Sequence, residues 1–198
     1  NEDIIIKQVE GVNVTINGDG KKYSGTFTIH GNARSEGAET LTFQNINFTT
    51  SESDHIFIDA NSTASAERYA HNVTVKDCSF TATGLVNNYY KTAVALRLRQ
   101  SFNIAVNNCT FNNLQSVYQA YGNNGIAIDN ITVEDCWNGI SVGTSTNVVI
   151  KNSNINASLG YGVRADGTGA YDLTIESSSI KAPRPVVVRE TTGAYNLT

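Results

Sequence analysis

The stretch that decides the fold is Asn72-Val-Thr-Val-Lys-Asp-Cys-Ser-Phe80, and it recurs as Asn103-Ile-Ala-Val-Asn-Asn-Cys-Thr-Phe111. In each copy apolar and polar residues alternate, and an Asn or Asp precedes the Cys. Less similar copies lie at residues 13–16, 41–48, 130–136, 147–155 and 172–180. Corresponding residues are 17 to 32 positions apart. A constant phrase with variable spacing indicates strands of fixed length joined by loops of variable length.

A second alternating segment follows most copies of this phrase. It lies at residues 55–59, 93–99, 139–143, 162–166 and 185–189. Alternation with a period of two is typical of strands with one buried and one exposed face. Each repeat thus contains two such strands, and the shortest repeat has no room for a helix. This predicts an all-β fold, a β-solenoid in which about seven parallel coils stack on each other. An antiparallel sandwich is the alternative, because turn dipeptides such as Asn17-Gly18 occur, but a sandwich does not require the repeat.

The composition also favours strands. The chain has 198 residues, in which 34 Val and Ile outnumber 8 Leu, and β-branched residues favour strands. We expect a single domain over residues 1–198. Because the sequence has no Met, we expect this domain to come from a longer protein. The net charge of -4 argues against a nucleic-acid partner, and the lack of an apolar run near 18 residues argues against membrane insertion.

In a solenoid each position of the phrase becomes a column of neighbouring side chains. We expect Cys78, Cys109 and Cys136 to stack as small apolar side chains in an interior column, with the preceding Asn and Asp residues stacked at a turn. The Cys spacing lacks the close ligand pairs of a zinc site, and their odd number argues against a disulfide framework. The three His are scattered and are expected on the surface or in loops, at positions 30, 55 and 71. The sequence therefore predicts no metal and no cofactor.

The exposed side of the second strand carries the candidate binding site. We align the second strands so that the side chains of residues 58, 98, 142, 165 and 188 face the core. This alignment predicts two columns of side chains that face outward. One holds Phe57, Arg97, Ser141, Arg164 and Val187, and the other holds Asp59, Arg99, Gly143, Asp166 and Arg189. Arg binds oxyanions through two parallel hydrogen bonds, and aromatic rings stack on sugar faces. The predicted carbohydrate-binding residues are therefore Asp59, Tyr90, Arg97, Arg99, Tyr118, Arg164, Asp166 and Arg189.

The same charges allow a second interpretation. Opposite charges in neighbouring rungs could pair with each other, Arg99 with Asp59 or Arg164 with Asp166. The face would then be a solvated sheet with no ligand.

The phrase Asn-x-Thr-Val-x-Asp-Cys-x-Phe, followed by a Gly-Ile-x-Val strand, resembles the pectate-lyase-like superfamily over residues 12–198. This resemblance implies a right-handed, single-stranded parallel β-helix. It does not imply one activity, because the architecture hosts lyases, hydrolases, esterases, adhesins and phage tailspikes. It also implies a secreted or cell-surface protein, of bacterial origin, with a polysaccharide or glycan as partner.

The catalytic motifs of these enzymes are not matched. Arg184-Pro-Val-Val-Val-Arg189 differs in spacing from the Arg-x-Pro-x-x-Arg pattern of pectate lyases, and residues 92–97 resemble a pectinesterase segment without its carboxylates. The paired acids of polygalacturonases are missing. We therefore expect a noncatalytic domain that interacts with carbohydrate or acts as an adhesive scaffold. A polysaccharide lyase or glycoside hydrolase, with catalytic residues partly outside this sequence, and a structural spacer are the alternatives.

Overall fold

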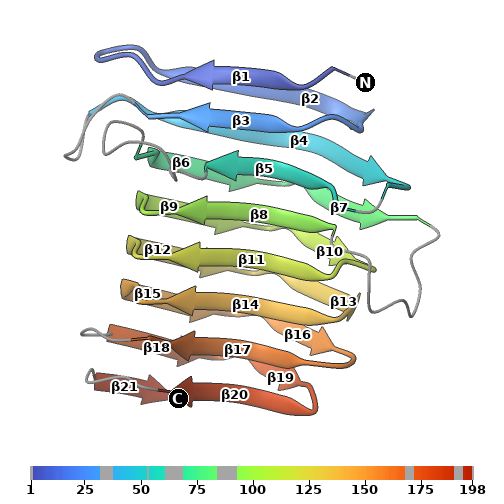
Figure 1. Cartoon of the computed structure of the whole chain (residues 1–198), viewed down its shortest axis with the longest axis vertical. Helices are drawn as coiled ribbons and strands as arrows, with labels where there is room; N and C mark the ends of the chain where they lie inside the picture. Colours follow the sequence, from blue (N-terminus) through green and yellow to red (C-terminus); the bar gives the residue numbers. More distant parts are fainter. Residues whose placement is uncertain are drawn as a thin grey trace.

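The computed structural model describes residues 2–31, 38–52, 54–60, 69–83, 93–167, 172–189 and 194–197, the last of these as backbone only. In these ranges the regular secondary structure is β-strand, and the paired strands are parallel. The strands stack as successive coils from the N-terminal to the C-terminal end of the molecule (Figure 1). This architecture is a parallel β-helix, so the predicted all-β solenoid is confirmed.

The first sheet takes one strand from each coil and forms the front of the molecule in Figure 1. Its eight strands are, in order, β1 (Ile4–Lys7), β3 (Phe27–His30), β5 (Ile56–Ala60), β8 (Val94–Arg99), β11 (Ser116–Tyr121), β14 (Asn138–Gly143), β17 (Tyr161–Asp166) and β20 (Arg184–Arg189). Alternate residues point into the core, so the others form an outer face of polar side chains.

The remaining thirteen strands form two further ladders that join at the N-terminal end. The second ladder contains β6 (His71–Lys76), β9 (Phe102–Asn107), β12 (Asn124–Asp129), β15 (Thr146–Lys151), β18 (Asp172–Glu176) and β21 (Ala194–Leu197). The third ladder contains β7 (Ser79–Ala82), β10 (Thr110–Asn112), β13 (Thr132–Cys136), β16 (Asn154–Ala157) and β19 (Ser179–Lys181). The long strands β2 (Val14–Tyr23) and β4 (Leu41–Thr50) run through both ladders.

The register of β12 corrects one repeat. Residues 130–136 were expected to align with 103–109, but Ile126 of β12 lies beside Ile104 and Val148. Ile126 is 22 residues from each of them, so these coils have equal length. Residues 130–136 resemble residues 103–109 in sequence, but the two segments run mainly in different ladders. Residues 132–136 form β13, which pairs with β10 and β16 of the third ladder.

The same shift corrects the Cys column. Cys78 and Cys109 occupy equivalent positions in adjoining coils, as predicted. Each lies two residues after a member of the backbone pair Lys76 and Asn107. Cys136 is buried at a different corner, where it pairs with Ala157. The column that contains the other two Cys consists of Ile46, Cys78, Cys109, Ile131, Ser153 and Ser178.

Polar side chains build the corner between the second and third ladders, as expected, but Asn130 occupies the position expected for Asp135. The residues of this corner adopt a left-handed backbone with φ from 49° to 55°, and they are Asn45, Asp77, Asn108, Asn130, Asn152 and Ser177. Asn130 Nδ2 donates to Asn108 Oδ1 at 2.8 Å, and Asn108 Nδ2 donates to Asp77 Oδ1 at 3.2 Å. Asn tolerates this backbone better than most residues, which explains why four of the six corner residues are Asn.

This corner predicts how substitutions at Asn108 rank. Both Asn108→Ala and Asn108→Gly remove the amide ladder, but only Ala places a Cβ on a residue with φ of 54°. We expect Asn108→Ala to be less stable than Asn108→Gly by about 1 kcal/mol in urea unfolding. Equal stability of the two variants would contradict a strained left-handed corner.

Candidate carbohydrate-binding face

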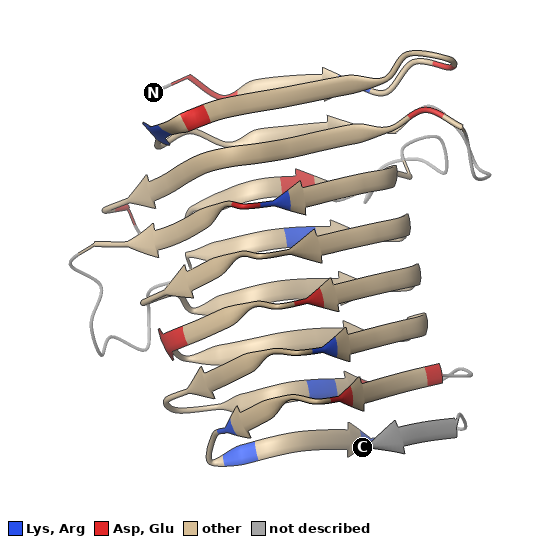
Figure 2. Ribbon diagram, turned by 180° about the vertical axis from the view of Figure 1, so that it is seen from behind, with Lys and Arg blue, Asp and Glu red and all other residues tan. Residues whose placement is uncertain are grey.

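The register of the first sheet defines two outward columns. The Arg97 column holds Thr28, Asp59, Arg97, Gln119, Ser141, Arg164 and Val187. The Arg99 column holds Arg99, Tyr121, Gly143, Asp166 and Arg189. These columns mix Arg and Asp with uncharged side chains, so local arrangement decides the chemistry of this face. Seen from behind, the molecule also carries charged residues of both signs, spread along the stack (Figure 2).

Two predicted positions on this face are wrong. Asp59 belongs to the Arg97 column, because Ile58 pairs with Leu96 rather than with Leu98. Phe57, expected to point outward, is fully buried. Two consecutive residues, Phe57 and Ile58, face the core at the start of β5, so the simple alternation fails there.

Tyr118 is also not a surface residue. It is 1% exposed, and its ring lies in the core column between Leu96 and Ile140. Its hydroxyl accepts a hydrogen bond from Asn123 Nδ2 at 3.2 Å, which satisfies the one polar atom of an otherwise apolar side chain. Tyr118 therefore cannot contact a ligand on this face. Tyr90 lies outside the described residues.

Arg97 already has a partner. Its Nε lies 2.9 Å from Asp59 Oδ1 and its Nη2 lies 2.5 Å from Asp59 Oδ2. This bidentate pair joins neighbouring coils, as the second interpretation of the charges required, although Arg97 rather than Arg99 is the partner of Asp59. A ligand would have to displace Asp59 to use this guanidinium.

Arg164 is held against Tyr161 on β17, the seventh strand of the first sheet. Its guanidinium carbon lies 5.6 Å from the centroid of the Tyr161 ring, within the range of a cation–π contact. Its Nη2 donates to Asp166 on the same strand, while its Nε is buried without an acceptor among the described residues. Burial raises the pKa of Tyr161, so its hydroxyl stays protonated at neutral pH.

Two depressions flank Tyr161, and its side chain lines both. The Trp137 depression, of about 410 Å³, is lined among others by Trp137, Arg164, Arg184 and Arg189. The Tyr121 depression, also of about 410 Å³, is lined among others by Arg99, Gln119, Tyr121, Ser141 and Asp166. Tyr121 is 55% exposed. These are open surface grooves in which aromatic rings and Arg side chains converge.

The two depressions thus contain four of the predicted residues: Arg99 and Asp166 line the Tyr121 depression, and Arg164 and Arg189 line the Trp137 depression. Sequence reasoning did not include Tyr161, Trp137 and Arg184 among the site residues. Tyr161 was missed because strict alternation from the buried Val163 would turn Tyr161 inward. Gly162 and Val163 are both buried, so the alternation breaks between them and Tyr161 faces outward. A Cβ on Gly162 would lie 2.2 Å from Ile180, so this local reversal requires Gly.

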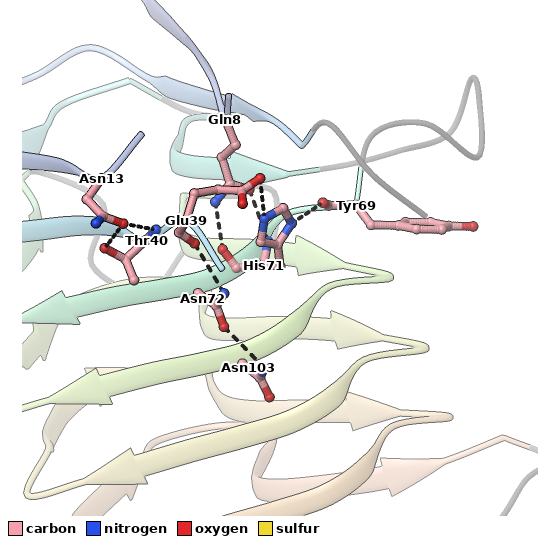
Figure 3. A network of polar contacts seen from close by, with 8 residues as sticks. All are labelled: Gln8, Asn13, Glu39, Thr40, Tyr69, His71, Asn72 and Asn103. Carbon is pink, nitrogen blue, oxygen red and sulfur yellow. Dashed lines mark hydrogen bonds and ion pairs between the residues drawn. The ribbon is translucent and has the colours of Figure 1, made fainter. Parts of the chain in front are cut away.

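A second polar cluster lies in the interior (Figure 3). His71 Nε2 lies 2.9 Å from Glu39 Oε1, and the two side chains are 0% and 2% exposed. The amide of Gln8 spans His71, donating to its carbonyl at 2.6 Å and accepting from its N–H at 3.0 Å. The prediction that the His residues lie on the surface or in loops is therefore wrong for His71, which is buried in β6. His55 lies in a loop before β5, as expected, although it is buried. Because the side chains of His71 and Glu39 lack solvent access, this cluster offers no surface to a substrate.

The described residues contain no group of three His, Cys, Asp or Glu that could hold a metal ion. The two carboxylates of the first sheet's face, Asp59 and Asp166, are separated by three intervening strands. They are too far apart to act as the paired carboxylates of a glycosidase.

The fold that carries these grooves is a parallel β-helix. The sequence matches the family described as Rhamnogalacturonase A/epimerase, pectate lyase-like, over residues 5–164, and the chain belongs to this family. Comparison with curated proteins and with solved structures found no match. Among the described residues, no helix is long and apolar enough to cross a membrane.

Proposed function

We propose that this chain is a carbohydrate-binding β-helix domain, noncatalytic by itself, that acts on the outside of the cell or in the secreted state. The ligand is an acidic polysaccharide, and it lies across Tyr161 between the Trp137 and Tyr121 depressions. Membership of a pectate lyase-like family supports a carbohydrate ligand. The observation that carries the proposal is the convergence of Tyr161 with Arg groups in both depressions.

The chemistry of the face suits a sugar that carries carboxylates. Arg99, Arg184 and Arg189 make no ion pair with any described residue, so their guanidinium groups are available for bidentate contacts to carboxylate oxygens. The exposed ring of Tyr121 and the half-buried ring of Tyr161 offer apolar surface to sugar rings. Asp166 and Ser141 add acceptors for sugar hydroxyls.

Two variants test this site by calorimetric titration with uronic-acid oligosaccharides. Tyr161→Ala removes the shared platform and is expected to raise Kd about tenfold, which corresponds to about 1.4 kcal/mol. Arg189→Ala is expected to raise Kd several-fold and to reduce the preference for the acid over its carboxyl-reduced form. The matched control is Lys151→Ala, which removes the same charge from β15 in the second ladder and should leave Kd unchanged. Unchanged binding by Tyr161→Ala and Arg189→Ala would reject this face.

Family membership also favours a second candidate, a polysaccharide lyase or glycoside hydrolase. Lyase action on uronic-acid polymers would release unsaturated products that absorb in the ultraviolet, and hydrolase action would release reducing ends. Turnover of either kind by this chain would replace the noncatalytic assignment. A structural spacer would bind no glycan at all.

A further inference from the structure

Cys78 and Cys109 lie side by side in adjoining coils. Asp77 N donates to Asn107 O at 3.1 Å, and Thr110 N donates to Cys78 O at 3.0 Å, so backbone hydrogen bonds fix the register on both sides of the pair. Neighbouring parallel strands are about 4.8 Å apart, which falls within the Cα separation of about 4.4–6.8 Å that a disulfide bond spans. The position of the two residues therefore permits a covalent cross-link.

The two side chains also adopt matching conformations. Each thiol donates to the carbonyl two residues earlier, Cys78 to Lys76 and Cys109 to Asn107, both at 3.2 Å. The neighbouring Cys109 thiol is the main reason that the pKa of Cys78 is lowered. Both side chains are buried, at 3% and 1% exposure.

We propose that Cys78 and Cys109 form a disulfide bond across adjoining coils when the chain folds in the presence of a small-molecule disulfide. The Cys78 thiolate attacks the oxidant, forms a mixed disulfide and releases one small thiol. The Cys109 thiolate then attacks the Cys78 sulfur and releases the second small thiol. The two Cys lose two protons and two electrons, and the oxidant gains both to become two thiols.

The bond should form during folding rather than afterwards. Burial in the folded state leaves an oxidant little access to either sulfur. The neighbouring Cys78 thiol and desolvation both raise the pKa of Cys109. Thiolates are the attacking species, so exchange in the closed solenoid should be slow. In the unfolding chain both thiols are exposed.

Cys136 serves as an internal control. It pairs with Ala157 at another corner, and burial raises its pKa to about 12. The odd number of Cys is then explained by one pair and one separate buried thiol. Ser is a suitable replacement in the Cys78 column, because Ser153 and Ser178 already occupy it and donate to the equivalent carbonyls at 2.7 and 2.8 Å.

The experiment refolds the full chain from urea into a mixture of oxidised and reduced glutathione. Monomer with native circular dichroism is then denatured and alkylated, and the added alkyl groups are counted by mass spectrometry. Wild type is expected to carry one alkyl group, Cys136→Ser none, and Cys78→Ser two. Three alkyl groups on refolded wild type, a glutathione adduct, or a peptide map that links Cys136 would overturn the proposal.

A stability measurement tests the same bond independently. In the Cys136→Ser background, oxidised protein is expected to have an unfolding constant about a hundredfold smaller than the reduced form. Adding Cys109→Ser should abolish this difference between redox conditions. If Ser impairs folding, Cys109→Val gives the same comparison, because the β-branched residues Ile46 and Ile131 already occupy this column. An equal unfolding constant in both redox conditions would contradict the bond.

Discussion

Replacing Phe80 by Ala is expected to lower the free energy of unfolding by about 3–5 kcal/mol. Phe80 is fully buried. Its ring stacks on Phe48 at 4.6 Å between centroids and on Phe111 at 5.1 Å, with interplanar angles of 4° and 7°. The three rings come from successive coils of the third ladder, so the substitution opens a cavity in the middle of a continuous stack. Urea unfolding followed by circular dichroism measures the change.

Two control variants separate the loss of this stack from a general effect of mutation. Phe80→Leu keeps most of the volume and is expected to cost less than about 1.5 kcal/mol. Tyr121→Ala removes an aromatic ring that is 55% exposed and should change stability by less than about 0.5 kcal/mol. A cost below about 1.5 kcal/mol for Phe80→Ala itself would contradict the stacked aromatic core.

Replacing Glu39 by Ala is expected to lower the free energy of unfolding by about 1–3 kcal/mol, because it leaves a buried polar side chain without its partner. The carboxylate contacts the buried imidazole of His71 at 2.9 Å, and the Glu39 carbonyl accepts from Asn72 Nδ2 at 3.1 Å. Removing the side chain leaves the imidazole without its charged partner in a site that water does not reach. The measurement is again urea unfolding at neutral pH.

The matched variants at this site differ in what they retain. Glu39→Gln keeps the size of the side chain and one acceptor oxygen, so it should cost less than Glu39→Ala. Glu52→Ala removes an exposed carboxylate and should change stability by less than about 0.5 kcal/mol. If Glu39→Ala and Glu52→Ala had the same small effect, the buried pair would not stabilise the fold.

The repeated phrase was sufficient to predict the solenoid, because strand periodicity and the Asn corner depend on local residue types. It was not sufficient to fix the register in every coil. The strands around Ile126 and Ile131 have similar apolar patterns, and only the backbone pairing with β9 and β15 distinguishes them. The misplacement of Cys136 follows from that ambiguity.

The candidate site was predicted in part for a related reason. A strict period of two places Arg99, Arg164, Asp166 and Arg189 correctly on the outer face. It fails wherever two consecutive residues turn inward, and Tyr161 was missed at such a position. The partner of Arg97 depends on the register between β5 and β8. A shift of two residues would place Asp59 beside Arg99 instead, so the spacing alone could not identify the Asp59–Arg97 pair.

The buried cluster of Glu39 and His71 lies outside what the repeat can predict. Glu39 lies before β4, and Gln8 follows β1, so neither belongs to the recurring phrase. Their contacts with His71 join three segments far apart in the sequence. No periodic pattern marks such a residue as buried, which is why the His residues were expected on the surface.

Trp137 provides the most direct test of the proposed binding face. It is the single Trp of the chain, it is half-buried, and it lines the depression beside Tyr161. Titration of wild type with a uronic-acid oligosaccharide is predicted to change Trp137 fluorescence along a saturable curve, which Tyr161→Ala shifts to about tenfold higher concentration. A spectrum that stays constant at saturating oligosaccharide would contradict binding at this face.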